Sequence, residues 1–202
     1  MTIRPMTPAL VPAVCGLHMA AAANTPSARL GRRYVVAFMS WFATAGDAIA
    51  FVAETESGHI VGYAIGAPVG YAGTLTLHLA WIGATAMLIR PWMLFDYRIW
   101  ATVKARIGFV FSRSATNTTG LPTPSMSLVG IAVDPSAAGK GVGFRLMKAF
   151  EERARDMRMA SLRLSVYPEN TGARRLYERC GWQPLPYPPT PNGTMYYGLI
   201  LQ

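Results

Sequence analysis

The sequence of 202 residues has few acidic residues and few cysteines. Only 10 Asp and Glu residues stand against 19 Lys and Arg residues, which gives a formal net charge of +9. The 2 cysteines, Cys15 and Cys180, lie far apart in the chain, so they offer neither a disulfide framework nor a metal-ligand pair. This cysteine usage favours a reducing compartment, and we expect no bound metal.

Two other kinds of segment are also missing. The opening MTIRPMTPALVPAV contains proline and polar residues where a signal peptide would carry an unbroken apolar stretch, so we expect a cytoplasmic protein. The arginines are scattered and form no basic run or zinc-finger, RRM-like or basic-zipper pattern. Nucleic acid is therefore the least favoured partner, while an anionic membrane surface and a phosphorylated small molecule both suit the charge.

A hydrophobic content of 51% in a chain of this length is enough for one sizeable core, so we expect a single domain over residues 1–202. The first part predicts a strand at TIRPM, a helix that starts at Thr7 and Pro8, a helix over residues 27–42, and a hairpin of strands 48–54 and 60–65. The last part predicts strand SMSLVGIAV, a helix over residues 141–157, strand SLRLSVY, a helix over residues 170–180 and strand TMYYGLIL. The segment PLPYPPTPNG is expected to be a proline-rich loop.

Three glycines at alternate positions, Gly139, Gly141 and Gly143, separate the strand SMSLVGIAV from the helix after it. Glycine lets a backbone approach a ligand closely, and the free N–H groups of a helix start attract anions. The spacing is not that of a P-loop, because no hydroxyl residue follows the lysine, and GxGxxG would need glycine at Phe144 or Leu146. The loop therefore predicts a backbone cradle suited to a pyrophosphate.

From Ser127 to Pro184 the sequence resembles the GNAT superfamily of acyl-CoA-dependent N-acyltransferases. The resemblance rests on the strand LVGIAVDP, the loop AAGKGVGFRL, the helix MKAFEERARDM and the segment LRLSVYPENTGARRLYERCGWQP. In the family's loop, Gln/Arg-x-x-Gly-x-Gly/Ala, backbone amides bind the CoA pyrophosphate, and Ala138 stands here in place of the leading Gln or Arg. The resemblance implies acetyl-CoA as co-substrate and a mixed α/β fold, with a twisted central sheet of about six to seven strands flanked by helices.

The resemblance also implies the residues of the donor site. Tyr177 would act as the catalytic acid toward the departing CoA thiolate, and Asn170, on the same helix face, would cap the helix and contact CoA. Arg145 and Arg175 are further cations that could meet the phosphates. The remaining expected donor-binding residues are Ile131, Ala132 and Val133 on the splayed strand, then Gly139, Lys140, Gly141, Val142, Gly143 and Phe144 in the loop, and Arg174.

The sequence does not identify a general base. In some relatives that acetylate peptide N-termini a glutamate sits five residues before the asparagine, but Ser165 stands at that position. The remaining candidates are Glu54, His78, Asp96 and a water molecule held by backbone carbonyls. His78 lies in an apolar run, where a buried core imidazole is the commoner case.

An apolar and basic insertion, residues 73–122, separates the hairpin from the rest of the resemblance. Residues 75–89 are apolar, but the run is shorter than the roughly twenty residues that span a bilayer. Farther on, apolar residues recur at intervals of three and four, which predicts a helix with a stripe of Trp92, Phe95, Ile99, Val103, Ile107 and Val110. We expect this helical insertion to form a cap over the acceptor; a dimer surface and a membrane-surface helix are the alternatives.

These observations predict an enzyme that transfers acetyl from acetyl-CoA to a primary amine by direct attack in a ternary complex. We expect a small-molecule acceptor, with a protein N-terminus or lysine as the alternative within the class. The alternative from another class is a CoA-binding or membrane-surface module without turnover. The sequence leaves open the acceptor, the acyl-chain preference and the oligomeric state, including a homodimer.

Overall fold

The computed structural model describes residues 1–21, 26–89, 120–187, 189 and 193–201. The strands in this part of the chain are β1 (Thr2–Pro5), β2 (Ile49–Glu54), β3 (Ile60–Pro68), β4 (Ser125–Val133), β5 (Ser161–Val166), β6 (Gln183–Pro184) and β7 (Met195–Ile200). They form one seven-stranded sheet in the order β1-β2-β3-β4-β5-β7-β6, in which the pairing is antiparallel except between β4 and β5. The predicted strand count and mixed α/β class are confirmed.

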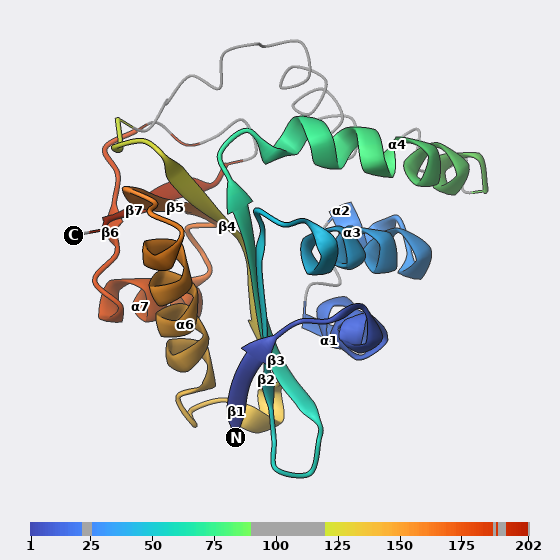
Figure 1. The fold of residues 1–202 in the computed structure, drawn as a ribbon, viewed down its shortest axis with the longest axis horizontal. Helices are drawn as coiled ribbons and strands as arrows, with labels where there is room; N and C mark the ends of the chain where they lie inside the picture. The colour runs from blue at the N-terminus through green and yellow to red at the C-terminus, as the bar shows by residue number, and fades with distance from the viewer. Residues whose placement is uncertain (22–25, 90–119, 188, 190–192, 202) are drawn as a thin grey trace.

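Helices cover both faces of this sheet (Figure 1). The first half of the chain supplies one helical layer, α1 (Val11–Ala21), α2 (Pro26–Arg29), α3 (Arg32–Thr44) and α4 (Tyr71–Ile89). The second half supplies the other layer, α6 (Val142–Asp156) and α7 (Thr171–Arg179). Each layer therefore comes from one continuous half of the chain.

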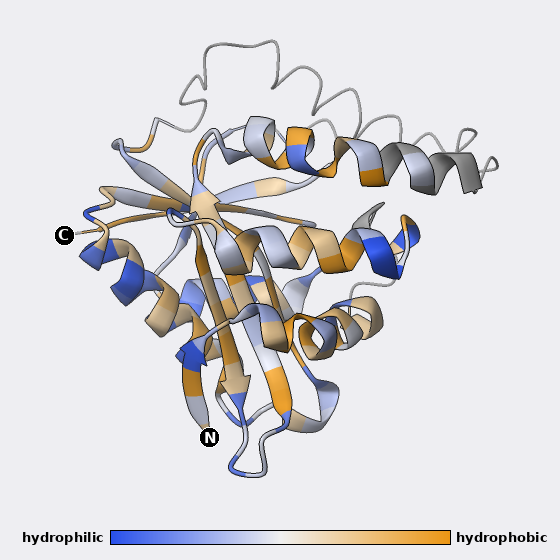
Figure 2. Cartoon of the chain, turned by 45° about the vertical axis from the view of Figure 1, so that its right-hand side comes forward, coloured by the Kyte–Doolittle hydropathy of each residue, from blue (hydrophilic) through white to orange (hydrophobic). Residues whose placement is uncertain are grey.

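Two apolar clusters lie between the sheet and these layers. Alternate side chains of a strand point to opposite faces, so Ala64 of β3 packs toward α6 while its neighbours Tyr63 and Ile65 pack toward α1 and α3. The buried residues of α6 recur at intervals of three and four and include Leu146 and Phe150. Figure 2 shows mainly apolar strands in the sheet, while the helices carry both hydrophilic and apolar residues.

Three local predictions from the sequence are corrected. The single helix expected over residues 27–42 is interrupted, because Gly31 has a φ of 94°, outside the helical range, and α3 starts after it. The proline-rich segment contributes Pro184 to the two-residue strand β6, which pairs with Tyr197 of β7. Thr7 is an N-cap residue as expected, but the element that starts at Pro8 is a 3-10 turn, and the Thr7 side chain makes no capping hydrogen bond.

The described part of the insertion is the helix α4, which packs against α3. Leu75 and Leu79 are buried, so this part of the insertion belongs to the core, whereas Leu77, His78 and Trp81 are exposed. The expectation of a core imidazole at His78 was therefore wrong. The helix predicted from Trp92 onward lies outside the described residues. Within the described part of the chain, no helix combines the length and hydropathy needed to cross a membrane.

Candidate functional site

The sheet opens between β4 and β5. Residues 125–127 of β4 pair with residues 161–163 of β5, and the two strands then separate. A β-bulge leaves Val129 without a partner on β3 immediately after this point, and such bulges bend a strand and increase its twist. The candidate residues Ile131, Ala132 and Val133 remain paired with β3, so their strand keeps a free edge on the side of β5. Backbone groups along this edge are available to a ligand.

The glycine loop lies between the end of β4 and α6. Gly139 and Gly141 both have a φ of 75°, and a Cβ atom at either position would meet no atom within 4 Å. The backbone conformation, and not crowding, therefore requires glycine at these two positions. Gly141 is the N-cap residue of α6, and its carbonyl accepts a hydrogen bond from the N–H of Arg145 at 3.0 Å.

This loop presents a set of backbone donors that the protein itself does not use. Among the described residues, no hydrogen bond is made by the N–H groups of five of the predicted loop residues, Gly139, Gly141, Val142, Gly143 and Phe144. The N–H of Lys140 donates to the carbonyl of Ala137, at a long 3.4 Å. Because the positive end of a helix dipole lies at the same place, the loop can hold an anion such as a phosphate. We call these five N–H groups the cradle.

Gly143 has a second role in packing. A Cβ atom at this position would lie 3.0 Å from Cδ2 of Leu176 on α7, so the absent side chain lets α7 approach the start of α6 closely. Leu176 directly precedes Tyr177, the predicted catalytic residue. The contact therefore brings α7, which carries Tyr177, against the start of α6.

Tyr177 is buried on α7. Its ring centroid lies 6.3 Å from that of Trp182 and 6.0 Å from that of Tyr197. Burial raises the pKa of Tyr177 to about 12, so the phenol stays protonated at neutral pH. Its hydroxyl group makes no hydrogen bond to another described residue. The side chain of Asn170 accepts a hydrogen bond from the N–H of Ala173 at 3.1 Å, which confirms its predicted capping role.

Sequence reasoning missed a buried carboxylate that links α6 to the segment after α7. Glu151 of α6 is fully buried and accepts hydrogen bonds from Nε1 of Trp182 at 2.9 Å and from Nζ of Lys148 at 2.8 Å. Nζ of Lys148 also donates to the carbonyl of Cys180 at 3.4 Å. Because Trp182 contacts Tyr177, these bonds fix the end of α7. The only signal in the sequence is that Glu151 falls on the buried stripe of α6, beside Phe150.

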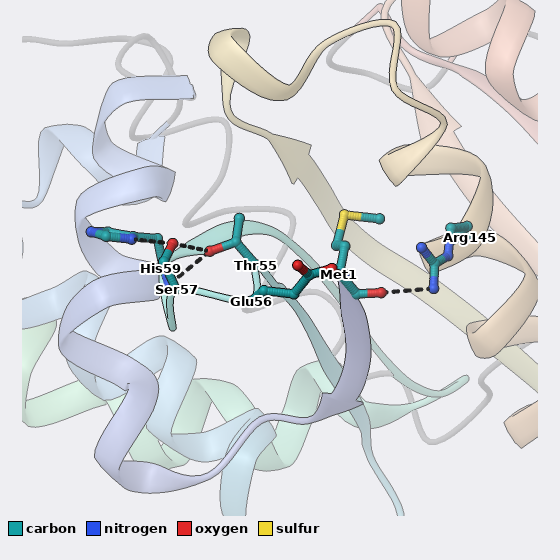
Figure 3. Close-up of polar contacts among 6 residues, drawn as sticks. All are labelled: Met1, Thr55, Glu56, Ser57, His59 and Arg145. Carbon is teal, nitrogen blue, oxygen red and sulfur yellow. Dashed lines mark hydrogen bonds and ion pairs between the residues drawn. The ribbon is translucent and has the colours of Figure 1, made fainter.

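The predicted phosphate-binding cations differ in their surroundings. Lys140 and Arg175 are exposed. Nη2 of Arg145 donates to the carbonyl of Met1 at 2.9 Å (Figure 3). The amino group of Met1 in turn pairs with Glu56 of the β2–β3 turn at 3.3 Å. The Arg174 guanidinium donates to the Tyr197 hydroxyl at 3.2 Å and to the carbonyl of Pro168 at 3.1 Å. Arg145 and Arg174 thus have protein partners, and their phosphate contacts stay predictions.

The structure also locates the candidate bases. Glu54 forms a two-point ion pair with Arg4, in which Nη2 lies 3.0 Å from Oε1. His78 and Ser165 are exposed on α4 and β5. Asp96 lies outside the described residues. None of the described candidates stands at the opening between β4 and β5 with a free carboxylate or imidazole.

A buried histidine and tyrosine, which sequence reasoning also missed, lie near this opening. Nδ1 of His18 is 2.6 Å from the hydroxyl oxygen of Tyr63, and both side chains are buried. Burial lowers the pKa of His18, so its imidazole is neutral at pH 7. His18 follows Val11 and Val14 on the apolar stripe of α1, and this spacing is the one signal that predicts its burial.

The split sheet, the cradle at the start of α6 and the buried tyrosine on α7 define a protein of the acyltransferase class that the sequence resembles. The sequence model of the acetyltransferase (GNAT) family matches residues 18–182, and the chain belongs to this family. The predicted family and enzyme class are thereby confirmed. Within the part of the chain that the structure describes, no group of three or more His, Cys, Asp and Glu side chains could hold a metal ion.

Solved structures share this fold over almost the whole chain. The ribosomal-protein-S18-alanine N-acetyltransferase of Escherichia coli is 17% identical, with a TM-score of 0.58 over 98% of this chain and 92% of that chain. The polyamine N-acetyltransferase of Drosophila melanogaster is 18% identical, with a TM-score of 0.61 over 99% of each chain. The aminoglycoside N-acetyltransferase AAC(6')-Iy in complex with CoA is 16% identical, with a TM-score of 0.63 over 94% and 91%. A comparison with curated protein sequences finds no match.

Proposed function

We propose that the protein transfers the acetyl group of acetyl-CoA to the primary amine of a small molecule by direct attack in a ternary complex. One observation carries this proposal: the start of α6, which bears the cradle, packs at Gly143 against Leu176, the residue before Tyr177 on α7. A donor whose phosphates bind in the cradle can extend along the free edge of β4 and present its thioester to α7. CoA has this length and charge distribution.

The cradle would supply most of the donor's orientation. Its N–H groups are fixed by the backbone, so they need no rearrangement when a phosphate arrives. The net charge of +9 also attracts the anionic donor at long range. The free edge of β4 at Ile131 and Val133 would hold the pantetheine amides by the hydrogen bonds that β5 no longer takes up.

Tyr177 would act on the leaving group. In the reaction, the amine nitrogen bonds to the thioester carbon, the C–S bond breaks, and the sulfur leaves with the electron pair. An ordinary thiol has a pKa of about 8.5, so the Tyr177 phenol is a weaker acid than the departing thiol and keeps its proton while the sulfur gains charge. The phenol therefore stabilises the thiolate first as a hydrogen-bond donor, and any proton that it gives up returns from solvent.

The acceptor class is supported by the neighbours and limited by the charge. The named activities of the three similar structures concern a polyamine, an aminoglycoside and a ribosomal-protein alanine, all of which are amines. A chain with a net charge of +9 repels polycations, so we favour an amine with one positive charge or with an acidic group. Amino acids and amino-sugar phosphates fit this description better than polyamines do.

An acceptor panel tests the proposal by the release of free CoA thiol from acetyl-CoA. The panel contains amino acids, amino sugars with and without phosphate, polyamines, an aminoglycoside and a peptide with an N-terminal alanine. We expect turnover with a small amine. Turnover with the peptide alone would instead favour a protein acetyltransferase, and acetyl-CoA binding without any turnover would favour the binding module.

A further inference from the structure

The reaction proposed above needs a group that accepts a proton. An aliphatic amine is an ammonium ion at neutral pH, and its nitrogen must lose a proton to attack the thioester. Glu54 is held by Arg4, and Ser165 replaces the glutamate of some relatives. His18 and Tyr63 form a buried hydrogen-bonded pair, and both the strand β3 and the helix α1 that carry them contact β4.

The position of Tyr63 follows from the strand register. Tyr63 of β3 is paired with Ala132 of β4, in the stretch where β4 has lost β5 as a partner. A Cβ atom at Gly130 would lie 3.7 Å from Cε2 of Tyr63, so the Tyr63 ring borders β4 at a position without a side chain. The helix α1, which carries His18, packs against both β3 and β4. The pair therefore lies over the strand that flanks the opening.

The pair also lies on the appropriate face of the sheet. His18 and Tyr63 belong to the apolar cluster under α1, α3 and α4. The cradle and Tyr177 belong to the other face, with α6 and α7. A donor that enters from the α6 side and an acceptor that enters from the α1 side would meet at the edge of β4 between them. Nucleophile and leaving group then have separate proton partners.

We propose that Tyr63 and His18 together accept the proton of the attacking amine. This inference rests on the proposed acetyl transfer. The ammonium group of the acceptor first loses one proton to solvent and becomes a neutral amine. As the N–C bond forms and the C–S bond breaks, the Tyr63 hydroxyl oxygen takes the second proton from this nitrogen and passes its own proton to Nδ1 of His18. Tyr63 ends as a neutral phenol and His18 as an imidazolium, which returns the proton to solvent after the amide leaves. The leaving thiolate is stabilised independently by the hydroxyl group of Tyr177.

The surroundings of the pair agree with this role. The other titratable side chains of the same apolar cluster that the structure describes are Cys15 and Tyr34, with Tyr71 at its edge. The charged group that acts on this cluster at Cys15 is the guanidinium of Arg32, at the start of α3. Burial lowers the pKa of the His18 imidazole, so the imidazole stays neutral and able to accept a proton at pH values below its ordinary pKa. Loss of this acceptor form is expected only as the pH falls through that lowered pKa.

Four variants test the inference, and the fourth, His18→Ala, is used for rescue by added imidazole. His18→Gln keeps a polar side chain opposite Tyr63 but accepts no proton, and Tyr63→Phe removes only the hydroxyl. Phe38→Leu is the matched control, because the centroid of the Phe38 ring lies 6.4 Å from that of His18 and this side chain has no group that can accept or donate a proton. The measurements are Tm, the Kd of acetyl-CoA by calorimetry, and kcat and KM for the best acceptor of the panel.

We expect kcat to fall roughly 10² to 10⁴-fold in His18→Gln and Tyr63→Phe, the range of general-base catalysis, while the Kd of acetyl-CoA changes less than about twofold. Phe38→Leu should lower Tm but keep kcat. Added imidazole should restore part of the kcat of His18→Ala in proportion to its neutral form, which a structural role would not produce. A His18→Gln enzyme with wild-type kcat, in an assay where Tyr177→Phe is impaired, would overturn the inference and leave the acetyl transfer standing. A wild-type protein that binds acetyl-CoA but turns over no amine would contradict the proposed function, and this inference with it.

Discussion

Replacement of Gly141 by alanine separates ligand binding by the cradle from simple packing. A Cβ atom there would touch nothing, so the substitution acts through the φ of 75°. An L-residue in this left-handed region costs about 1–2 kcal/mol, which a domain with a stability of about 5–15 kcal/mol tolerates. The variant should therefore fold. The loop either stays strained or relaxes, and relaxation turns N–H groups of the cradle away from the phosphates.

The expected loss of affinity follows from the hydrogen bonds involved. A hydrogen bond to a charged group contributes about 1.5–3 kcal/mol, so one misdirected N–H weakens acetyl-CoA binding roughly ten- to a hundredfold. For 202 residues, an unfolding entropy of about 2.1 cal/mol/K per residue converts each kcal/mol into about 2.4 °C of Tm. At a hundredfold excess over the wild-type Kd, acetyl-CoA adds about 2.7 kcal/mol, or about 6 °C. A hundredfold weaker variant gains only about 0.4 kcal/mol, or about 1 °C.

Differential scanning calorimetry with and without acetyl-CoA measures this difference. Gly16→Ala is the matched control, because Gly16 is exposed within α1, has open space around it and lacks a positive φ. It should raise the stability of the free protein by about 1 kcal/mol, the helix propensity of alanine over glycine, and keep the full shift with acetyl-CoA. If Gly141→Ala showed the same shift as the wild type, the cradle would not be the phosphate site.

Three further predictions concern the donor side. Tyr177→Phe should lower kcat about 10²-fold or more in steady-state assays while the acetyl-CoA affinity stays unchanged, and an unchanged kcat would return Tyr177 to a packing role. Because the pKa of Tyr177 is about 12, its ionisation should cause no loss of wild-type activity up to about pH 10. Glu151→Leu leaves Nε1 of Trp182 without an acceptor and should cost about 1–3 kcal/mol of stability in urea unfolding, whereas an equally stable variant would contradict the linking role of Glu151. Pantetheine without phosphates should raise Tm far less than CoA at equal concentration, and equal shifts would argue against phosphate binding.

The deletion of the insertion must respect the buried part of α4. Removal of residues 73–122 would take away Leu75 and Leu79, which are buried against the sheet and α3. Such a variant would expose core and aggregate for reasons unrelated to the acceptor. A deletion confined to residues 90–119 keeps this packing, and we expect it to retain acetyl-CoA binding while acceptor turnover falls. Unchanged kcat/KM for the acceptor would contradict the cap.

Local patterns in the sequence identified most of the fold and part of the site. The hairpin around Gly58, the cap at Asn170 and the loop at Gly141 depend on neighbouring residues, so their signals are contained in short segments. The break at Gly31 was missed because apolar residues continue on both sides of it, and periodicity alone does not register a change of φ.

Contacts between distant residues were not predictable in this way. His18 and Tyr63 are 45 residues apart, Trp182 and Glu151 are 31 apart, and Arg174 finds Tyr197 at a separation of 23. Each of these side chains appears in the sequence as an isolated polar residue or an ordinary aromatic one. Only the register of the sheet and the crossing of helices over it bring the partners together.

The division of the helices between the halves of the chain bears on how this protein can be altered. In the part of the chain that the structure describes, residues 1–89 supply the helices α1 to α4 of one face, and residues 120–201 supply α6 and α7 of the other. A recombination point between these halves would exchange one complete helical layer as a unit. The main contact that a hybrid must keep is the pairing of β3 with β4. Hybrids made with a relative at this point should take their acceptor preference from one parent and their donor site from the other.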